Sequence, residues 1–432
     1  MKKFLVCCFV FCCSQVNAQL SLSEAIDIAL KNNLNIKIEK NNEEVAKLNN
    51  HVGMAGGLPQ VTITSSDQQS VTDVHQKLNS GVTIVRSGAT ANNLNANLTG
   101  TLLLYNGNKV TATKKRLSQL EAMGTHQVQA VIQNTIAQVM QKYFELVKQQ
   151  KYLLTIEKSI DLSKQQFAII EVKKAEGLAN ITEWSQSKID LNNRIQEMQS
   201  QNAFIAQLKF ELINLLQISQ DNSIVFSNLT DSIVLNNNIQ LHDVLEGLEN
   251  NIEVILLEDQ VKIEDCIAKE TAALNKPSLR LNTGYNFSGL NTSAGQLLFN
   301  QISGPFIGVG LSIPIYNGQI FKRQEQIANL NKQTAVLRKT KTYADIETSA
   351  INLFQNYTSL KEQIKEQEET YLLSEQLVNL LLEKYKLAAA TIVDLREAQK
   401  SFEEAGFKRI SLLYAAKLAE IELLRLSGRL NK

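Results

Sequence analysis

The sequence predicts an α+β membrane protein in which four β-strands and two long helical hairpins form an internal tandem repeat. Three observations predict this class. Two stretches of roughly sixty-five residues have a helical spacing of apolar residues and no proline. All four prolines lie in or beside short segments that alternate between apolar and polar residues. Finally, the order of these features along the first half of the chain recurs in the second half.

Composition excludes several broad classes. The 432 residues include 44% hydrophobic residues and only four prolines, so the chain is neither disordered nor collagen-like. Its 44 basic residues balance 43 acidic ones, which leaves no basic field for nucleic acid. The four histidines are dispersed without metal-ligand spacing, and we expect them to be surface residues. No GxSxG, HExxH or phosphate-binding glycine loop occurs, so the sequence predicts no catalysis, metal or cofactor.

The first eighteen residues predict a secretory signal peptide. Lys2 and Lys3 precede an apolar stretch, and residues 16–18 (Val-Asn-Ala) form a small-residue cleavage pattern after which the peptide would be removed. Four of the five cysteines lie inside this segment, so the mature chain keeps only Cys266 and forms no internal disulfide. A lipid anchor on Cys12 is disfavoured, because Phe11 stands where a small residue would be expected.

The repeat divides the mature chain into two halves, residues 19–220 and 221–432. The segment "LSLSEAIDIALKNN" at Leu20 is echoed by "IQLHDVLEGLENN" at Ile239, and "LYNG" at Leu104 by "IYNG" at Ile315. Later, "ANITEW" at Ala179 corresponds to "ATIVDL" at Ala390. Each half is therefore expected to contain the same elements in the same order.

The helices come in two lengths. Short amphipathic helices are predicted from Leu22 to about Asn50 and from Leu241 to about Leu274. Long helices are predicted at about 109–176 and 321–387. At 1.5 Å per residue each would reach roughly 100 Å, too long for a compact core. Turns near 177–184 and 388–395 would return each chain segment as a second helix, giving antiparallel hairpins packed by heptad-like seams.

The strands are predicted at about 60–72, 92–105, 278–288 and 304–316. In "GPFIGVGLSIPIY" the bulky residues alternate strictly with small or polar ones, which gives one apolar face. The segment "QVTITSS" is the weakest of the four. Because no stretch after the signal peptide has the roughly 18 consecutive apolar residues of a membrane-spanning helix, the mature chain could cross a membrane only as a barrel.

Four strands cannot close on themselves, and unpaired strand edges are not tolerated in lipid. If the sheet lies in a membrane, the chain must therefore form an oligomer, and three chains would supply twelve strands. The alternative is a soluble four-stranded sheet that caps a coiled coil, since alternation over about ten residues also occurs in soluble sheets.

Taken together, these features resemble the TolC-like outer-membrane efflux proteins. The signal peptide, "LSLSEAIDIALKNN", the strand pair closed by "LYNG", the hairpin turn "GLANITEW" and the duplicated "TIVDL" turn carry the resemblance. It implies a homotrimer with a twelve-stranded β-barrel in the outer membrane and a twelve-helix α-barrel across the periplasm. It also implies a passive exit duct of a tripartite efflux or type I secretion system, with a periplasmic adaptor and an inner-membrane transporter of the RND, ABC or MFS type.

The resemblance assigns two sets of site residues. Two corners mark where a strand becomes a tunnel helix, and they comprise Tyr105, Asn106, Gly107, Tyr316, Asn317 and Gly318. In this position Tyr suits a membrane interface and Asn-Gly suits a tight turn. The periplasmic entrance would comprise Tyr385, Asp394, Glu397, Thr182 and Glu183.

At the entrance the sequence departs from the family pattern, because Ala390 stands where an Arg is expected. This departure puts the ion-pair latch of the entrance in doubt unless Lys386 or Arg396 replaces that Arg. Alternatively, Asp394 and Glu397 are ordinary solvated carboxylates that suit a helix start. Trp184, the only Trp, is expected to pack inside its own hairpin rather than to contact a partner helix.

A second class of function also fits long hairpins: a periplasmic adaptor-like scaffold with no membrane barrel. Adaptors usually have one hairpin flanked by soluble β modules and no whole-chain duplication, so the duct is favoured. The sequence names neither the substrate nor the transporter.

Overall fold

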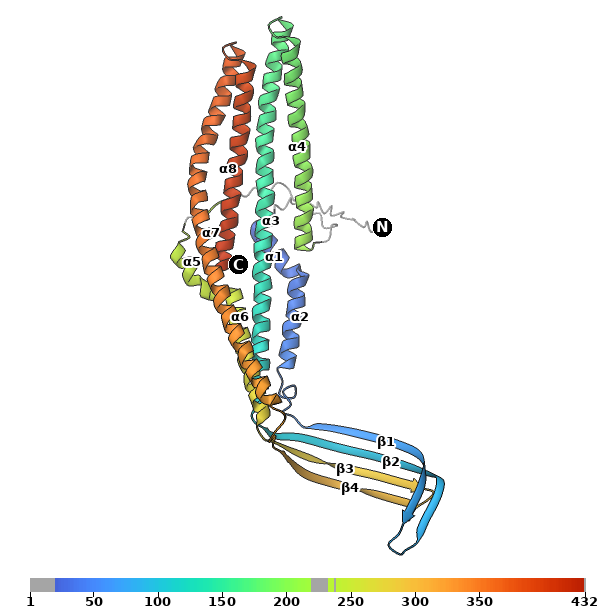
Figure 1. The fold of residues 1–432 in the computed structure, drawn as a ribbon. Helices are drawn as coiled ribbons and strands as arrows, with labels where there is room; N and C mark the ends of the chain where they lie inside the picture. The colour runs from blue at the N-terminus through green and yellow to red at the C-terminus, as the bar shows by residue number, and fades with distance from the viewer. Residues whose placement is uncertain (1–19, 219–231, 237, 431–432) are drawn as a thin grey trace, which may run out of the picture. The chain divides into compact units, whose positions relative to one another are not determined.

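A computed structural model describes residues 20–218, 232–236 and 238–430 (Figure 1). The predicted signal peptide lies outside the described residues. The chain forms two compact units: the hairpin unit takes its described residues from 1–39, 128–254 and 342–432, and the sheet unit comprises 40–127 and 255–341. Each unit draws on both halves of the sequence, so these units cut across the predicted repeats.

The elements follow the same order in both halves. The first half contains α1 (Leu22–Asn32), α2 (Leu34–Asn49), β1 (Gln60–Lys77), β2 (Thr83–Asn106), α3 (Lys109–Ala175) and α4 (Ile181–Leu216). The second contains α5 (Leu241–Gly247), the 3₁₀ turn η1 (Leu248–Asn250), α6 (Ile252–Ala272), the 3₁₀ turn η2 (Ala273–Asn275), β3 (Ser278–Thr292), β4 (Phe299–Ser312), α7 (Ile320–Lys386) and α8 (Ile392–Leu426).

Each of the two predicted short helices is broken by a buried asparagine. Asn33 has ψ 121°, outside the helical range, and its side-chain oxygen accepts hydrogen bonds from Asn35 N (2.8 Å) and Ile36 N (3.2 Å). Asn251, with ψ 126°, accepts in the same way from Glu253 N at 2.9 Å. Both side chains cap the helix that follows. The prediction of one continuous helix is therefore wrong in both halves.

The long helices agree closely with the prediction. Helices α3 and α7 each have 67 residues, and their return helices α4 and α8 have 36 and 35. Gly177 (φ +74°) and Ala388 (φ +56°) follow the ends of α3 and α7 in the left-handed conformation that commonly terminates helices. Asn180 and Thr391 then cap α4 and α8. In the described part of the chain no helix is long and apolar enough to span a membrane.

The hairpin unit has several hydrophobic clusters, one of them around α3 and another around α7. Tyr143 of α3 packs with residues of α1 and α4, and its hydroxyl donates to Leu20 O at 3.1 Å. Tyr357 of α7 has a comparable role in the second half, since its hydroxyl donates to Asn236 O at 2.6 Å. Burial, together with the negative charge of Glu420, raises the pKa of Tyr357 to about 12. Each buried tyrosine thus ties a long helix to the segment that precedes its short helix.

The four strands form one antiparallel sheet in the order β1-β2-β3-β4. Strands β1 and β2 are longer than predicted, and the weak segment "QVTITSS" begins an 18-residue strand. Strand β4 starts earlier than predicted, at Phe299, and ends at Ser312 rather than near residue 316. Pro314 lies just beyond this end, and a proline has no backbone N–H to donate to a sheet.

The register confirms the predicted difference between the two sheet faces. Val309 lies opposite Leu281, which lies opposite Leu102 on β2, and Ile307 lies opposite Thr283. Ile307 and Val309 are 77% and 63% exposed. On the other face, Gly308 lies opposite Asn282, which lies opposite Thr101 on β2. This apolar face is exposed in the single chain, and an exposed apolar surface is typical of a contact with another protein or with a membrane.

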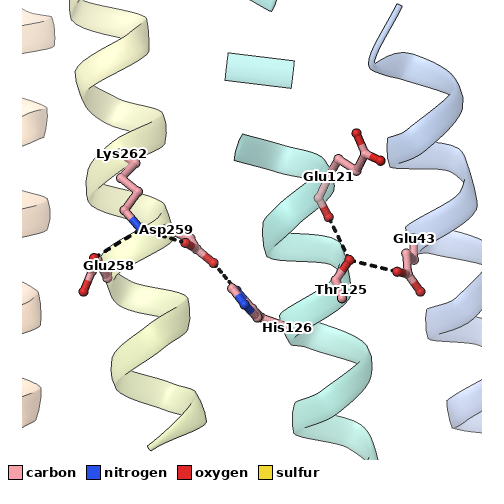
Figure 2. Close-up of polar contacts among 7 residues, drawn as sticks. All are labelled: Glu43, Glu121, Thr125, His126, Glu258, Asp259 and Lys262. Carbon is pink, nitrogen blue, oxygen red and sulfur yellow. Dashed lines mark hydrogen bonds and ion pairs between the residues drawn. The ribbon is translucent and has the colours of Figure 1, made fainter. Parts of the chain in front are cut away.

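Polar contacts connect three helices of the sheet unit (Figure 2). His126 Nδ1 of α3 lies 2.5 Å from the carboxylate of Asp259 on α6, whose side chain is only 3% exposed, and Lys262 Nζ lies 3.5 Å from the same carboxylate. Thr125 donates to Glu43 of α2 at 2.8 Å. The expectation that all four histidines are surface residues is therefore wrong for His126; the other three are exposed.

The helix break at Asn251 should be required for stability. Its amide donates to Leu426 O at 2.9 Å while its oxygen caps α6. We expect Asn251→Ala to lower the free energy of unfolding by about 1–3 kcal/mol, because it removes a cap and leaves a buried carbonyl without its donor. Chemical denaturation followed by circular dichroism measures this loss. The exposed Asn238 provides the control, and equal losses in Asn251→Ala and Asn238→Ala would contradict the role of the break.

Candidate functional site at the hairpin turns

The turn between α7 and α8 is built around Thr391 and Asp394. Thr391 N and Oγ1 donate to Asp394 Oδ2 at 3.0 and 2.7 Å, and Asp394 N donates to Thr391 Oγ1 at 3.2 Å. This reciprocal arrangement is a capping box. The hydrogen bonds from Thr391 lower the pKa of Asp394. Asp394 therefore carries its negative charge while fixing the start of α8, and the exposed Glu397 lies one turn further along.

Tyr385, at the end of α7, contacts the first hairpin through Lys173. The Tyr385 side chain is buried, and its pKa is raised by burial and by the negative charge of Glu183. Lys173 of α3 donates to Tyr385 O at 2.6 Å, and its ammonium lies 4.1 Å from the centre of the Tyr385 ring. Thr182 is exposed on the first turn of α4. These contacts join the turns of the two hairpins through α3 and α7.

Trp184 packs inside its own hairpin, as expected. Its ring centre lies 5.9 Å from that of Phe167 on α3, and Lys174 lies 4.1 Å from the ring centre. Both contacts connect α4 to α3, so the side chain stabilises the first hairpin.

Of the two cations considered as replacements for the missing Arg, only Arg396 crosses to the first hairpin. Arg396 Nε of α8 lies 3.0 Å from Asp190 Oδ2 of α4. Lys386 instead pairs with Glu383 of its own helix at 2.5 Å. Ala390 lies in the turn before Thr391 and carries no charge. The ion pair between the two hairpins thus lies about one and a half turns beyond Ala390, the position that the family pattern suggests.

In a second ion pair the charges are exchanged, so that α4 contributes the cation and α8 the anion. Arg194 of α4 contacts Glu403 of α8, which also accepts from Ser159 of α3. The Glu403 side chain is 8% exposed and that of Arg194 26% exposed. Burial raises the pKa of Glu403, although Ser159 and Arg194 oppose this shift. We call Asp190, Arg194, Arg396 and Glu403 the clasp, since α4 and α8 each contribute one arginine and one carboxylate.

The clasp borders a hollow of about 460 Å³ between the first hairpin and α8. Nearby, the side-chain amide nitrogens of Gln166 and Gln399 are buried and have no hydrogen-bond partner among the described residues. A polar interface of this kind fixes helix register more than it adds stability. Among the described residues, no group of three or more His, Cys, Asp or Glu side chains is arranged to hold a metal ion.

Sequence reasoning missed three members of the clasp. The burial of Glu403 could have been predicted from the sequence. It lies among Leu395, Phe402 and Ala405 on a strongly apolar stretch of α8, where an unpaired charge would be costly. The sequence gives a weaker indication for Asp190 and Arg194: their four-residue spacing places both on one face of α4. Neither signal identifies the partner across the helix interface.

The strand-to-helix corners have the predicted tight turns. Gly107 (φ +66°) and Gly318 (φ +68°) are both left-handed, a conformation that glycine adopts readily. A Cβ on Gly107 would also lie 2.5 Å from the Lys276 Cβ. Asn106 accepts from Val110 N at 3.3 Å and so caps α3. Tyr105 and Tyr316 are 45% and 80% exposed, whereas the Asn317 amide nitrogen is buried without a partner among the described residues.

The Arg194–Glu403 contact should be energetically coupled. Arg194→Gln leaves the buried Glu403 carboxylate without its ion-pair partner, so we expect it to lower the free energy of unfolding by about 1.5–3 kcal/mol. Glu403→Gln should cost less, because Arg194 keeps Glu197 as a partner at 3.4 Å. The double variant should lose less than the sum of the two. Urea unfolding of the four proteins measures this coupling, and Arg338→Gln on an exposed part of α7 is the control.

The same series has a pH dependence. Because burial raises the pKa of Glu403, the folded state binds this proton more readily than the unfolded state, and the site contributes more stability as pH falls from neutral. Glu403→Gln should remove that contribution. Additive losses together with an unchanged pH dependence would contradict the coupling.

Comparison with known proteins supports the fold. A family model described as "Outer membrane efflux protein" matches residues 25–216. A search of curated proteins returns no match.

Solved outer-membrane channels share the fold. The structure of CusC has a TM-score of 0.77 at 18% identity, covering 95% of this chain and 92% of that one. VceC of Vibrio cholerae has 0.79 at 16% identity, covering 94% and 96%. CmeC of Campylobacter jejuni has 0.77 at 16% identity, covering 94% and 85%. The first half of the chain thus matches the outer membrane efflux protein family, and the described chain has the fold of these outer-membrane channels.

Proposed function

We propose that three copies of this chain assemble into a twelve-stranded β-barrel in the outer membrane, continued by a helical tunnel in the periplasm. The observation that carries the proposal is the sheet itself. Its order leaves β1 and β4 as edges, each with one row of unpaired backbone groups. In lipid such edges must be paired, and pairing β1 of one copy with β4 of the next would close the sheet.

The apolar sheet face supports a lipid-facing surface. The apolar residues on β4 (Ile307, Val309 and Leu311) are well exposed, and their register neighbours on β3 and β2 are mostly apolar. The strands have 14 to 24 residues, and about 9–11 suffice to cross a bilayer. The opposite face is lined by asparagine, threonine and glycine, as a water-filled passage requires.

In this assembly the protein is a passive exit duct of a tripartite efflux or type I secretion system. The energy would come from an inner-membrane transporter of the RND, ABC or MFS type, and a periplasmic adaptor would join it to the duct. The family match supports these partners in general terms. The alternative, an adaptor-like scaffold with no membrane barrel, leaves the exposed apolar sheet face without an explanation.

The hairpin turns are the proposed periplasmic entrance. In a trimer, Asp394 and Glu397 would contribute six carboxylates to the mouth, where low-dielectric walls strengthen their field and favour cations. Tyr385, Glu183 and Thr182 would form the adjoining wall. The clasp would act as the latch, because its two ion pairs hold α8 against α4 and one of its arginines supplies the charge that Ala390 lacks.

Assembly and membrane insertion provide the test. The wild type should sediment with outer membranes and run as a trimer on an unheated gel. A charge on the apolar face should impair both, so we expect Val309→Arg to cost about 2–4 kcal/mol if the residue lies near the bilayer midplane.

The neighbouring Gly308→Arg is the matched control, because Gly308 is on the opposite face and a Cβ there would meet no heavy atom within 4 Å. It should assemble nearly normally. Equal damage from both substitutions would mean that the faces are wrongly assigned, and a soluble monomer of the wild type would contradict the channel itself.

A further inference from the structure

A basic hollow lies in the sheet unit, where the polar face of the sheet meets the first turns of α3 and α7. Its volume is about 460 Å³, and its lining comes from the ends of β2, β3 and β4 and from the starts of both helices. Lys109, Lys276 and Arg280 are its three charged residues, and no carboxylate lines it. The hollow therefore gathers positive charge from segments that are far apart in sequence.

None of these three cations has an ion-pair partner within the part of the chain that the structure describes. The surroundings do not neutralise them either. The first turns of α3 and α7 contain no acidic residue, so the positive ends of both helix dipoles remain uncompensated. Arg116, further along α3, is already paired with Glu270 at 2.7 Å. Glu325, on the second turn of α7, accepts a hydrogen bond from Asn275. The hollow is left with a net positive field.

Arg280 lies on the polar face of the sheet. It is opposite Gly310 on β4 and Leu103 on β2, in the row of residues that points away from Val309 and Leu281. It is the only charged residue of β3 and β4. Gly310 has no side chain, so the space beside Arg280 stays open. If the sheet closes as proposed, this face lines the passage rather than the lipid.

The rest of the lining is of two kinds. Leu103, Leu274, Pro314 and Phe321 form an apolar wall, whereas Ser278 and Ser312 present hydroxyl groups. Three cations beside hydroxyl donors match a phosphate or carboxylate, and the apolar wall matches a hydrocarbon or aromatic body attached to it. Inorganic ions would use only the first part of this surface.

We propose that this hollow is a binding site for amphipathic anions, small molecules with a phosphate or carboxylate group on an apolar body, that pass through the channel. Its position in the passage rests on the proposed function, but its chemistry does not. A lipid head group offers the same anionic chemistry, and the polar-face position of Arg280 favours the passing solute. The site also gives the repeated corner a further role, since Lys109 follows the first Asn-Gly turn and Phe321 follows the second.

Binding is tested first in detergent solution, where no closed passage is needed. Titration calorimetry with phenyl phosphate should show binding to the wild type at low salt, weaker as salt rises. Arg280→Gln and Lys276→Gln should each weaken it about tenfold, and the triple variant that adds Lys109→Gln should abolish it. Lys322→Gln removes an exposed cation of α7 outside the hollow and should change nothing.

Two further probes separate the parts of the site. Inorganic phosphate should bind more weakly than phenyl phosphate, and equal affinities would overturn the apolar wall as part of the site. Unchanged binding in the triple variant would overturn the site as a whole. The trimer band and circular dichroism spectrum of each variant confirm folding, which the exposed Arg280 and Lys276 side chains should not disturb.

Single-channel recordings in planar bilayers then test the position. Phenyl phosphate should reduce the wild-type current and leave the triple variant unaffected, with and without phosphatidylglycerol in the bilayer. If phenyl phosphate binds in detergent but does not change the current, the hollow does not line the passage and the sheet does not close around it. The binding site itself would stand. Loss of phenyl phosphate binding in the presence of phosphatidylglycerol would identify the lipid as the occupant and overturn the passing solute.

Discussion

The backbone edges of β1 and β4 impose the constraint on which the rest of the structure depends. A four-stranded sheet with one apolar face can lie in lipid only if both edge rows of N–H and C=O groups find partners. Within the chain, β1 and β4 are separated by β2 and β3, so neither edge can satisfy the other. Copies of the same chain can satisfy both at once, and a closed ring of copies leaves no edge. In such a ring, the alternation of apolar and polar residues would assign one face to lipid and the other to water.

The packing of the helices depends on polar contacts as well as apolar ones. Two 67-residue helices expose many side chains, and a seam of purely apolar contacts between such helices could slide by one turn with little cost. The polar contacts remove that freedom. Asn251 joins the start of α6 to the end of α8, and the clasp fixes α4 against α8. Because Arg194 and Glu403 are more buried than Arg396 and Asp190, we infer that the first pair holds the register and the second can open at lower cost.

The sequence predicted those parts of the fold that local patterns determine. Proline-free stretches with helical spacing located α3 and α7 to within about one residue, and strict alternation identified the apolar face of β4. The helix breaks at Asn33 and Asn251 were missed, since an asparagine within an amphipathic pattern acts as a cap only when its tertiary environment favours the break. His126 was missed for a similar reason: its partner Asp259 lies in the other half of the chain. At the candidate entrance, the assignment of Tyr385 and Glu183 by resemblance stays a prediction. The pairing of Arg194 with Glu403 depends on how two hairpins pack, which no local pattern specifies.

Disulfide cross-linking between the two sheet edges tests the central claim most directly. In a Cys266→Ser background, Thr62→Cys on β1 is combined in turn with a cysteine at each position from Gly304 to Ser312 on β4. Within one chain these edges are about 14 Å apart across three strand spacings, too far for a disulfide, which needs Cα atoms within about 7 Å. Oxidation should therefore give covalent dimers and trimers for one or two adjacent positions on β4, with no larger species. If every pair stays monomeric while the protein is membrane-inserted, or if oxidation gives an open series of larger oligomers, the sheet does not close as a ring of three chains.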